Sequence, residues 1–168
     1  MSQIKLVIMD VDGTLTDGKI YMGEQGEMMK AFHVKDGYAI ADIMPKHNLI
    51  PIVLTARKSE IVANRCKELG ISQLYQGIKD KYTALKEIAD KFHIIPGKDG
   101  IYNSIAYIGD DIIDIACMRW VGIVGCPSDA VKEVKNVAHF ISQYKGGNGA
   151  VREFTEWLIA NMNESQKF

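Results

Sequence analysis

Five aspartates in two short segments are the residues of this 168-residue sequence best suited to chemistry: Asp10, Asp12, Asp110, Asp111 and Asp114. Carboxylates gathered at one place repel one another unless a cation lies among them. Neither segment, 10–14 or 109–114, contains a histidine or a cysteine, and oxygen donors alone favour Mg²⁺. Each segment taken alone could be a surface turn or a helix cap. Together they predict a magnesium site.

Each acidic segment directly follows an apolar run that we predict to be a strand. Ile4–Met9 precedes Asp10, and Ile105–Ile108 precedes Gly109–Asp114. Residues two apart on an extended chain face the same side, so Asp10 and Asp12 can reach one site. Open α/β sheets bind ligands at the carboxyl ends of their parallel strands, and we expect both segments at that edge.

The other elements predict an α/β fold, a doubly wound parallel sheet in a single domain over residues 1–168. Near-continuous apolar strands indicate burial on both faces of this sheet. The further strand candidates are Ile50–Leu54, Val121–Val124 and His139–Ile141, and the helix candidates are Tyr38–Met44, Lys58–Leu69, Asp80–Phe92 and a segment around Val151–Met162. Pro45 is expected to end or kink the first of these helices.

One segment interrupts the alternation of strands and helices. Lys19–Met22 and Glu27–Phe32 have the composition of two strands, and the glycine-bounded residues 23–26 join them. This pattern is typical of a β-hairpin. We therefore predict a hairpin insertion of about residues 18–33 directly after the first strand.

Two further residues could act on a phosphate group. Thr55 follows the strand Ile50–Leu54, and Lys81 opens a predicted helix. A threonine hydroxyl can bond to a phosphate oxygen, and an ammonium group can neutralise phosphate charge. Either residue alone would be interpreted as structural or solvated. The functional interpretation depends on the order in which these two residues and the two acidic segments occur along the chain.

In that order, residues 10–14, Thr55, Lys81 and 109–114 resemble the four motifs of the haloacid dehalogenase (HAD) superfamily. The resemblance covers nearly the whole chain. It implies a Rossmann-like HAD fold and a magnesium-dependent phosphomonoesterase that forms an aspartyl-phosphate intermediate.

The resemblance also implies a role for each residue. Asp10 would attack phosphorus, and Asp12 would protonate the leaving alkoxide and then activate water. Thr55 and Lys81 would hold the transferring phosphoryl group. The implied magnesium ligands are Asp10, the backbone carbonyl of Asp12, and Asp110, with Asp111 and Asp114 in support.

The spacing between these motifs leaves no room for a cap domain. Asp10 to Thr55 holds only the hairpin and one helix, and Thr55 to Lys81 holds one helix and a short strand. An open site requires a large substrate or cover from another subunit. The hairpin offers apolar side chains for packing: Ile20, Tyr21, Met22, Met28, Met29 and Phe32. We predict a homotetramer in which subunits cover each other's sites.

Four longer segments carry a more specific resemblance: Asp17–Gly23, Lys30–Tyr38, Leu74–Gly77 and Gly146–Glu153. They are similar to those of the 3-deoxy-D-manno-octulosonate 8-phosphate phosphatases, which are capless and tetrameric. This resemblance implies a sugar-acid phosphate substrate on the route to lipopolysaccharide. The implied substrate-binding residues are Asp12, His33, Val34, Lys35, Asp36, Gly37, Arg57, Arg65 and Lys81.

Several of these assignments have alternatives. Arg65 could lie on a solvated helix face, and Asp36-Gly37 could be a helix cap and turn. The chain also departs from the family at His33, Lys35, Ala41, Ala56 and Asn148. A phosphatase for a related nonulosonate 9-phosphate is therefore the main alternative enzyme.

The glycine-rich segment Gly146–Gly149 precedes the last predicted helix. Free amides there could bind an anion, or the segment could be a plain helix-entry turn. In the family this tail can reach an active site, of its own subunit or of a neighbour.

Composition excludes several other classes of protein. The net charge of −1 provides no basic field for nucleic acid, and no apolar run is long enough to cross a bilayer. Three cysteines without a CxxC pair indicate reduced thiols in the cytoplasm, and the histidines lack zinc-ligand spacing.

Two non-enzymatic classes share parts of the pattern. A receiver domain has its phosphorylated Asp on a middle strand, whereas here the DxD pair follows the first strand. A catalytically silent assembly domain would be expected to have lost an aspartate, and here none is missing.

Overall fold

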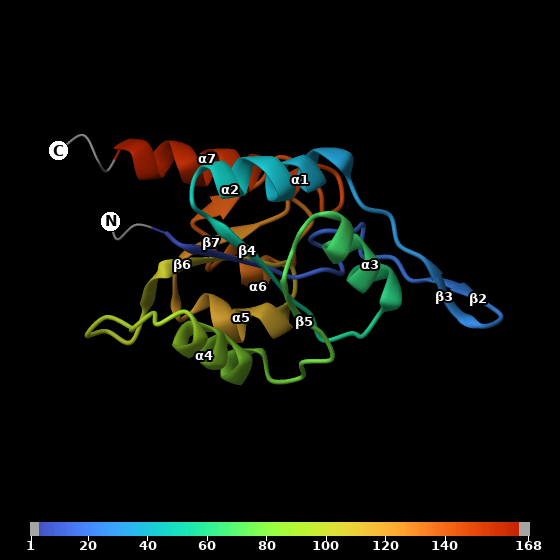
Figure 1. Cartoon of the computed structure of the whole chain (residues 1–168), viewed down its shortest axis with the longest axis horizontal. Helices are drawn as coiled ribbons and strands as arrows, with labels where there is room; N and C mark the ends of the chain where they lie inside the picture. The colour runs from blue at the N-terminus through green and yellow to red at the C-terminus, as the bar shows by residue number, and fades with distance from the viewer. Residues whose placement is uncertain (1–3, 165–168) are drawn as a thin grey trace.

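A computed structural model of the chain describes residues 4–164 (Figure 1). Residues 1–3 and 165–168, the two ends of the predicted domain, lie outside that range. Parallel strands form a six-stranded sheet in the order β5-β4-β1-β6-β7-β8. They are β1 (Leu6–Met9), β4 (Ile50–Leu54), β5 (Gln73–Tyr75), β6 (Tyr102–Ile108), β7 (Val121–Cys126) and β8 (Phe140–Ile141). The predicted parallel sheet is confirmed.

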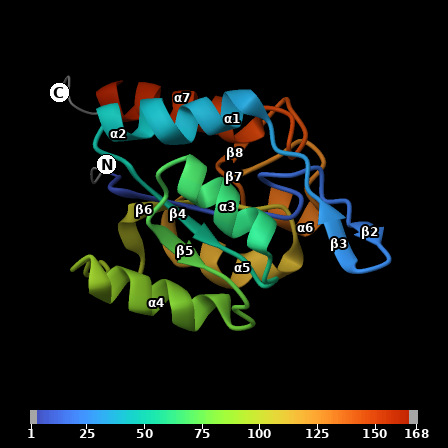
Figure 2. The ribbon, with the colours of Figure 1, turned by 45° about the vertical axis from the view of Figure 1, so that its right-hand side comes forward.

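Helices cover both faces of this sheet (Figures 1 and 2). One face carries α1 (Val34–Tyr38), the π-helical turn η1 (Ala39–Ile43), α2 (Met44–Lys46), α3 (Glu60–Glu68) and α7 (Ala150–Glu164), and the other carries α4 (Lys81–Lys91), α5 (Ile112–Met118) and α6 (Lys132–Lys135). Along β1, Leu6 and Ile8 pack in one apolar cluster, and Val7 and Met9 pack in the other. The sheet is therefore buried on both faces, which explains why its strands are almost wholly apolar.

The helix predicted at Tyr38–Met44 starts earlier, at Val34, and stays helical through Lys46. Its middle is the π-helical turn η1, directly before the turn that contains Pro45. Proline lacks an N–H donor and its ring crowds the carbonyl four residues earlier, so a wider turn accommodates it. The helix ends one residue after Pro45, close to the predicted stop.

The predicted hairpin consists of β2 (Tyr21–Gly23) and β3 (Gly26–Met29), which pair antiparallel. It projects from the body of the molecule (Figures 1 and 2). Both strands are shorter than expected, and a single bridge between Thr16 and Phe32 joins the arms nearer the sheet.

Within the described residues no cap domain follows β1 or β4. No helix there combines the length and the apolar character needed to span a membrane.

Candidate active site

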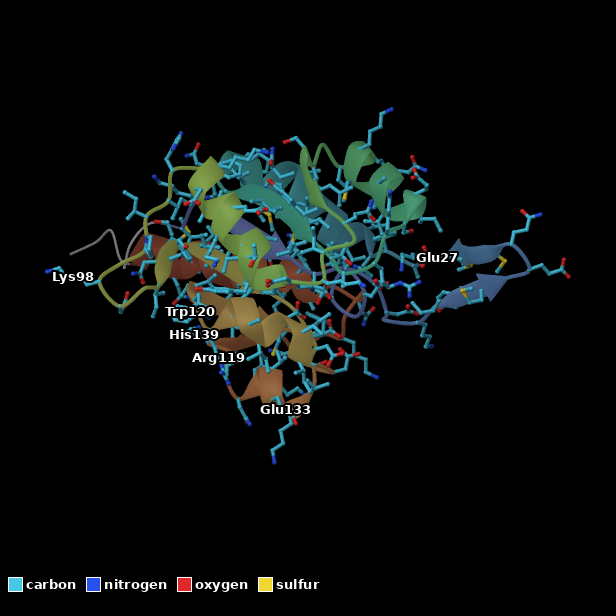
Figure 3. All side chains as sticks on the ribbon, turned by 90° about the horizontal axis from the view of Figure 1, so that it is seen from below. Glu27, Lys98, Arg119, Trp120, Glu133 and His139 are labelled. Atoms are coloured by element: carbon cyan, nitrogen blue, oxygen red, sulfur yellow. The ribbon has the colours of Figure 1, made fainter. Side chains whose placement is uncertain are left out.

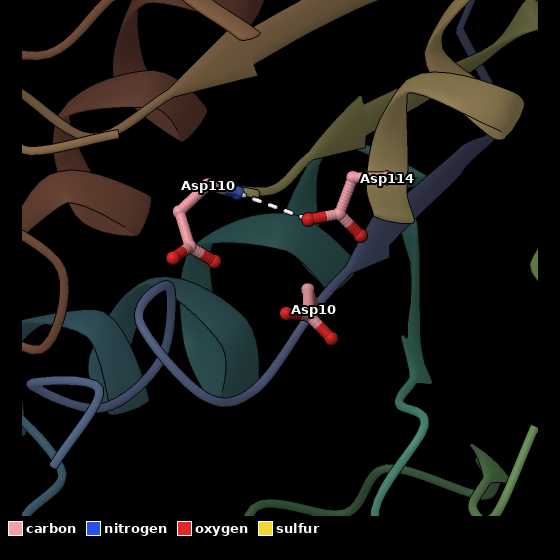
Figure 4. Close-up of side chains that lie close together, drawn as sticks. All are labelled: Asp10, Asp110 and Asp114. Atoms are coloured by element: carbon pink, nitrogen blue, oxygen red, sulfur yellow. Dashed lines mark hydrogen bonds between the residues drawn. The ribbon is translucent and has the colours of Figure 1, made fainter. Parts of the chain in front are cut away.

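The two acidic segments meet at the carboxyl edge of the sheet. β1 and β6 are neighbours, with Met9 opposite Ile108, so the loops that follow them leave the sheet at the same level. Carboxylate oxygens of Asp10, Asp110 and Asp114 all lie within 4.8 Å of one another (Figure 4). This convergence is the one expected from the strand positions.

The turn after Asp12 requires a glycine. Gly13 has a φ of +91°, a conformation that side-chain-bearing residues rarely adopt. A β-carbon at this position would lie 2.1 Å from Oδ2 of Asp110. The hydroxyl of Thr14 donates a 3.2 Å hydrogen bond to Oδ1 of Asp110. The tight turn therefore brings the first loop into contact with the second acidic segment.

The electrostatics of the cluster fit a bound cation. Burial raises the pKa of Asp10 to about 7, and repulsion from Asp114 adds to the effect while Lys81 opposes it. Burial also raises the pKa of Asp110 to about 7, with repulsion from Asp10 and Asp114 as further causes. A divalent cation would offset this repulsion, and carboxylate oxygens are the donors that Mg²⁺ prefers. The residues present therefore fit the predicted magnesium ion.

Asp114 is fully buried, and both of its oxygens are engaged. Oδ1 accepts hydrogen bonds from Nζ of Lys81 at 2.7 Å and from the hydroxyl of Tyr107 at 2.6 Å. Oδ2 accepts from the backbone N–H groups of Asp110 and Asp111 at 3.1 and 3.2 Å. A carboxylate with four donors has no lone pair left for a metal. Asp114 therefore anchors the loop and Lys81, which fits a supporting role.

Asp111 differs from Asp114, although both follow the same strand. It is exposed, and its side chain caps α5 by accepting a 2.7 Å hydrogen bond from the N–H of Ile112. This is the helix cap that the sequence left open as an alternative, because an acid at a helix N-terminus satisfies free amides.

Lys81 and Thr55 lie at the same edge of the sheet as Asp10. Lys81, the first residue of α4, is 3% exposed, and its Nζ lies 2.7 Å from Oδ1 of Asp10. Burial opposes the charge of Lys81, but the carboxylates of Asp10 and Asp114 outweigh it and raise its pKa. Thr55 is buried directly after β4, the strand beside β1. The structure therefore sets a fixed cation against the predicted nucleophile.

Asp12 lies outside the three-acid cluster and faces the hairpin. Its carboxylate contacts the ammonium of Lys30 and lies 3.7 Å from Nε of Arg57. Glu27, labelled in Figure 3 where the hairpin meets the body, pairs with Lys30 at 2.9 Å and accepts a hydrogen bond from Ser59. Glu27, Lys30 and Ser59 were not predicted. The available signal was that Glu27 and Lys30 are the two charged residues of the mainly apolar arm Glu27–Phe32 and lie three positions apart, since a buried cation needs an anionic partner.

The predicted substrate loop 33–37 needs one correction. Asp36 is 2% exposed, and its carboxylate accepts hydrogen bonds from the N–H groups of Gly149 at 3.2 Å and Arg152 at 2.7 Å. Burial raises the pKa of Asp36, and these two bonds oppose the shift. Asp36 therefore caps the start of α7 and is not free to bind substrate. Val34, by contrast, is 79% exposed.

The remaining predicted substrate residues occupy two places. Gly37 packs against Arg65, because a β-carbon at residue 37 would lie 2.4 Å from the guanidinium. Arg65 pairs with Glu68 at 2.7 Å and lines a small apolar groove with His33. Lys35 borders a separate hollow beside the start of α7. Arg57 therefore lies beside Asp12 at the acidic site, whereas Arg65 lies in the separate groove with His33.

The glycine-rich segment before α7 is not an anion site. Its four N–H groups donate to the carboxylate of Asp129, the carbonyls of Thr14 and Lys145, and the carboxylate of Asp36. A β-carbon at Gly146 would lie 1.8 Å from the carbonyl oxygen of Gly13. The segment therefore packs against the first acidic loop of its own chain. Of the two alternatives left open by the sequence, these bonds favour the helix-entry turn.

The chain resembles known proteins in both sequence and structure. No protein-family model matches the chain. The 3-deoxy-D-manno-octulosonate 8-phosphate phosphatase KdsC of Escherichia coli (strain K12) is 41% identical over 156 residues, which cover 93% of this chain and 79% of the relative. The Yersinia pestis protein of the same name is 39% identical over 158 residues, covering 94% and 81%.

Solved structures agree with these sequence relatives. The crystal structure of the Yersinia pestis phosphatase has a TM-score of 0.87 at 38% identity, covering 98% of this chain and 85% of that one. The Moraxella catarrhalis phosphatase, solved with a magnesium ion, a phosphate ion and KDO, has a TM-score of 0.87 at 37% identity, covering 97% and 90%. This chain therefore belongs to the 3-deoxy-D-manno-octulosonate 8-phosphate phosphatase family of the HAD superfamily.

Proposed function

We propose that this chain hydrolyses 3-deoxy-D-manno-octulosonate 8-phosphate to the free sugar acid and inorganic phosphate, during synthesis of lipopolysaccharide precursors. The proposal rests on the buried carboxylate of Asp10, whose Oδ1 lies 2.7 Å from the ammonium nitrogen of Lys81. It stands in a chain 41% identical over 156 residues to a phosphatase named for that substrate. A silent assembly domain is disfavoured because the whole acidic cluster is retained.

In the first step, an oxygen of Asp10 forms a bond to phosphorus while the bond from phosphorus to the sugar oxygen breaks. The electron pair of the broken bond goes to the sugar oxygen, which takes a proton from Asp12. Lys81 and Thr55 hold oxygens of the transferring group at the edge of the sheet.

In the second step, a water oxygen bonds to phosphorus and its proton passes to Asp12. The bond between phosphorus and Asp10 then breaks, and its electron pair returns to the carboxylate. Magnesium would be held by Asp10, Asp110 and the backbone carbonyl of Asp12, and would supply positive charge that stabilises the transferring phosphoryl group.

The substrate also carries a carboxylate, which calls for a cation away from the phosphate. Arg57 has a 48% exposed side chain beside Asp12, and a planar guanidinium can bind a carboxylate through two hydrogen bonds. We propose that Arg57 binds the acid end of the sugar. The remaining proposed contacts come from His33, Val34, Lys35, Gly37 and Arg65.

A panel of 2-keto-3-deoxy sugar phosphates, compared by kcat/KM, tests the substrate. We expect the octulosonate 8-phosphate to be preferred over a nonulosonate 9-phosphate by at least ~10-fold, because site groups matched to one sugar are left unpaired by the other. A smaller preference, or the reverse order, would contradict the narrow assignment. An Asp10→Asn preparation run in parallel excludes a contaminating phosphatase.

We further propose that the chain works as a homotetramer with shared sites. On the projecting hairpin, Met22 is 63% exposed, Met28 64% and Met29 45%. Exposed apolar side chains on a projecting hairpin are suited to packing against another copy of a capless enzyme.

Gel filtration with light scattering tests the assembly, and the expected mass is near four times the 18.7 kDa of one chain. The double variant Met22→Glu with Met28→Glu should dissociate and lose kcat/KM for the sugar phosphate. Ile95→Glu is the matched control, because Ile95 is 85% exposed and lies outside the hairpin. A fully active monomer would refute shared sites.

We also propose that residues 1–168 act as one HAD-like domain in the cytoplasm. The three cysteines, all within the described residues, are buried and form no disulfide. Reduced thiols are typical of cytoplasmic proteins.

A further inference from the structure

A lysine of the hairpin lies directly against the acid proposed to transfer the proton. The side chain of Lys30 is 1% exposed, and its ammonium contacts the carboxylate of Asp12. Lys30 is the first residue of the segment Lys30–Tyr38, which carries the more specific resemblance, but it has no assigned role there. No step of the mechanism above uses it.

Two cations face Asp12, and Lys30 is the stronger partner. Arg57 has a 48% exposed side chain and its Nε is 3.7 Å away, so solvent screens most of that attraction. Lys30 is buried and in direct hydrogen-bond contact. Because ion pairing strengthens as water is excluded, the orientation of Asp12 depends mainly on Lys30.

Glu27 fixes Lys30 in turn. Its carboxylate lies 2.9 Å from the Lys30 ammonium and accepts the hydroxyl of Ser59, the residue at the N-cap of α3. Lys30 therefore has carboxylates on two sides, one on its own hairpin and one on the first acidic loop. A long side chain held at both flanks has little rotamer freedom left, so it forms a rigid link between hairpin and site.

We propose that Lys30 is a positioning residue, which holds the Asp12 carboxylate apart from Asp10 and aimed at the oxygen of the leaving sugar. The inference rests on the proposed function. When the phosphorus–oxygen bond breaks, its electron pair moves to that oxygen and the proton of Asp12 follows. Without Lys30, Asp12 would still be present but would no longer be held where this transfer occurs.

Leaving groups of different basicity test the proposal. An alkyl oxygen needs the proton, whereas p-nitrophenolate leaves without it, and kcat/KM reports the step in which the leaving group departs. Lys30→Met should lower kcat/KM by ~10²-fold for the sugar phosphate, which is within the range for general acid catalysis, and by less than ~5-fold for p-nitrophenyl phosphate. Lys19→Met, which removes an exposed lysine of the same segment, should change neither value.

Equal losses on both substrates would overturn the proposal, since a general structural defect has no leaving-group preference. Lys30→Met leaves Glu27 and Asp12 close together, so Glu27→Gln with Lys30→Met restores the local charge balance. This double variant should fold and show the same substrate contrast; failure to fold would make Lys30 a folding residue and would also overturn the proposal. A wild-type protein without activity dependent on Asp10 would instead refute the proposed function.

Discussion

Replacing Asp10 by asparagine is expected to lower kcat for the sugar phosphate by about 10⁴-fold or more, the scale seen when a covalent nucleophile is removed. The amide nitrogen and oxygen of asparagine cannot form the bond to phosphorus. Lys81 and the rest of the phosphate site remain, so the variant should still bind inorganic phosphate. Rapid acid quench of the wild-type enzyme with radiolabelled substrate should trap labelled protein, and the variant should trap none.

The same substitution should not destabilise the metal-free protein at alkaline pH. Burial raises the pKa of Asp10 from 3.8 to about 7, so the folded state prefers the protonated acid. The stability due to that proton is present in full below pH 3.8 and is lost as the pH rises through about 7. Asparagine is neutral at every pH. The melting temperature of the wild type, measured with a chelator, should therefore fall more between pH 5 and pH 8 than that of Asp10→Asn.

Two results would contradict this account of Asp10. One is a variant that retains a tenth or more of wild-type kcat, and the other is a wild-type enzyme that yields no labelled protein when it is quenched with acid during turnover. Either would mean that Asp10 is not the group that attacks phosphorus.

Asp114→Ala is expected to lower the free energy of unfolding by about 3 kcal/mol or more. It breaks the buried ion pair with Lys81 and leaves the hydrogen-bond donors of Asp114 without an acceptor. Lys81 would keep Asp10 as a partner, but the hydroxyl of Tyr107 and two backbone N–H groups would lose theirs. The loop that carries Asp110 would lose its anchor. We therefore also expect kcat to fall by at least ~10²-fold, as when one charge-stabilising donor is lost.

Asp111→Ala is the matched control, since it removes an aspartate three residues away on the same turn. Asp111 is exposed and caps α5, and removal of such a cap costs about 1 kcal/mol. Urea unfolding of both variants without metal measures the difference. If the two variants unfold at the same urea concentration, the buried network around Asp114 is not what holds this loop.

The sheet and the central acids could be predicted from sequence because their causes are local. A strand buried on both faces must be an apolar run, and ligands bind at the carboxyl ends of parallel strands. Those two rules place Asp10 and Asp110 at the same edge of the sheet, and the pairing of β1 with β6 then brings them together. The role of Lys81 followed from the order of the motifs and not from its own neighbours in sequence.

The roles of Asp36 and Lys30 could not be predicted in the same way, because their partners are distant in sequence. Asp36 caps a helix through N–H groups 113 and 116 residues later, and no periodicity reports such a contact. Lys30 reaches Asp12 only because the hairpin folds back against the first loop. Asp111 and Asp114 have the same residue type and nearly the same position, yet burial gives them different roles.

The packing of Gly146 against Gly13 and the hydrogen bond that the N–H of Arg152 donates to Asp36 have a consequence for biosynthesis. Asp36 leaves the ribosome long before the amides that it will bind, which lie 113 and 116 residues further along the chain. Contacts between such distant parts of a chain form late. The loop that carries the nucleophile is therefore not fully supported until residues 146–152 have been synthesised, and a nascent chain would not act on a metabolite before α7 has docked.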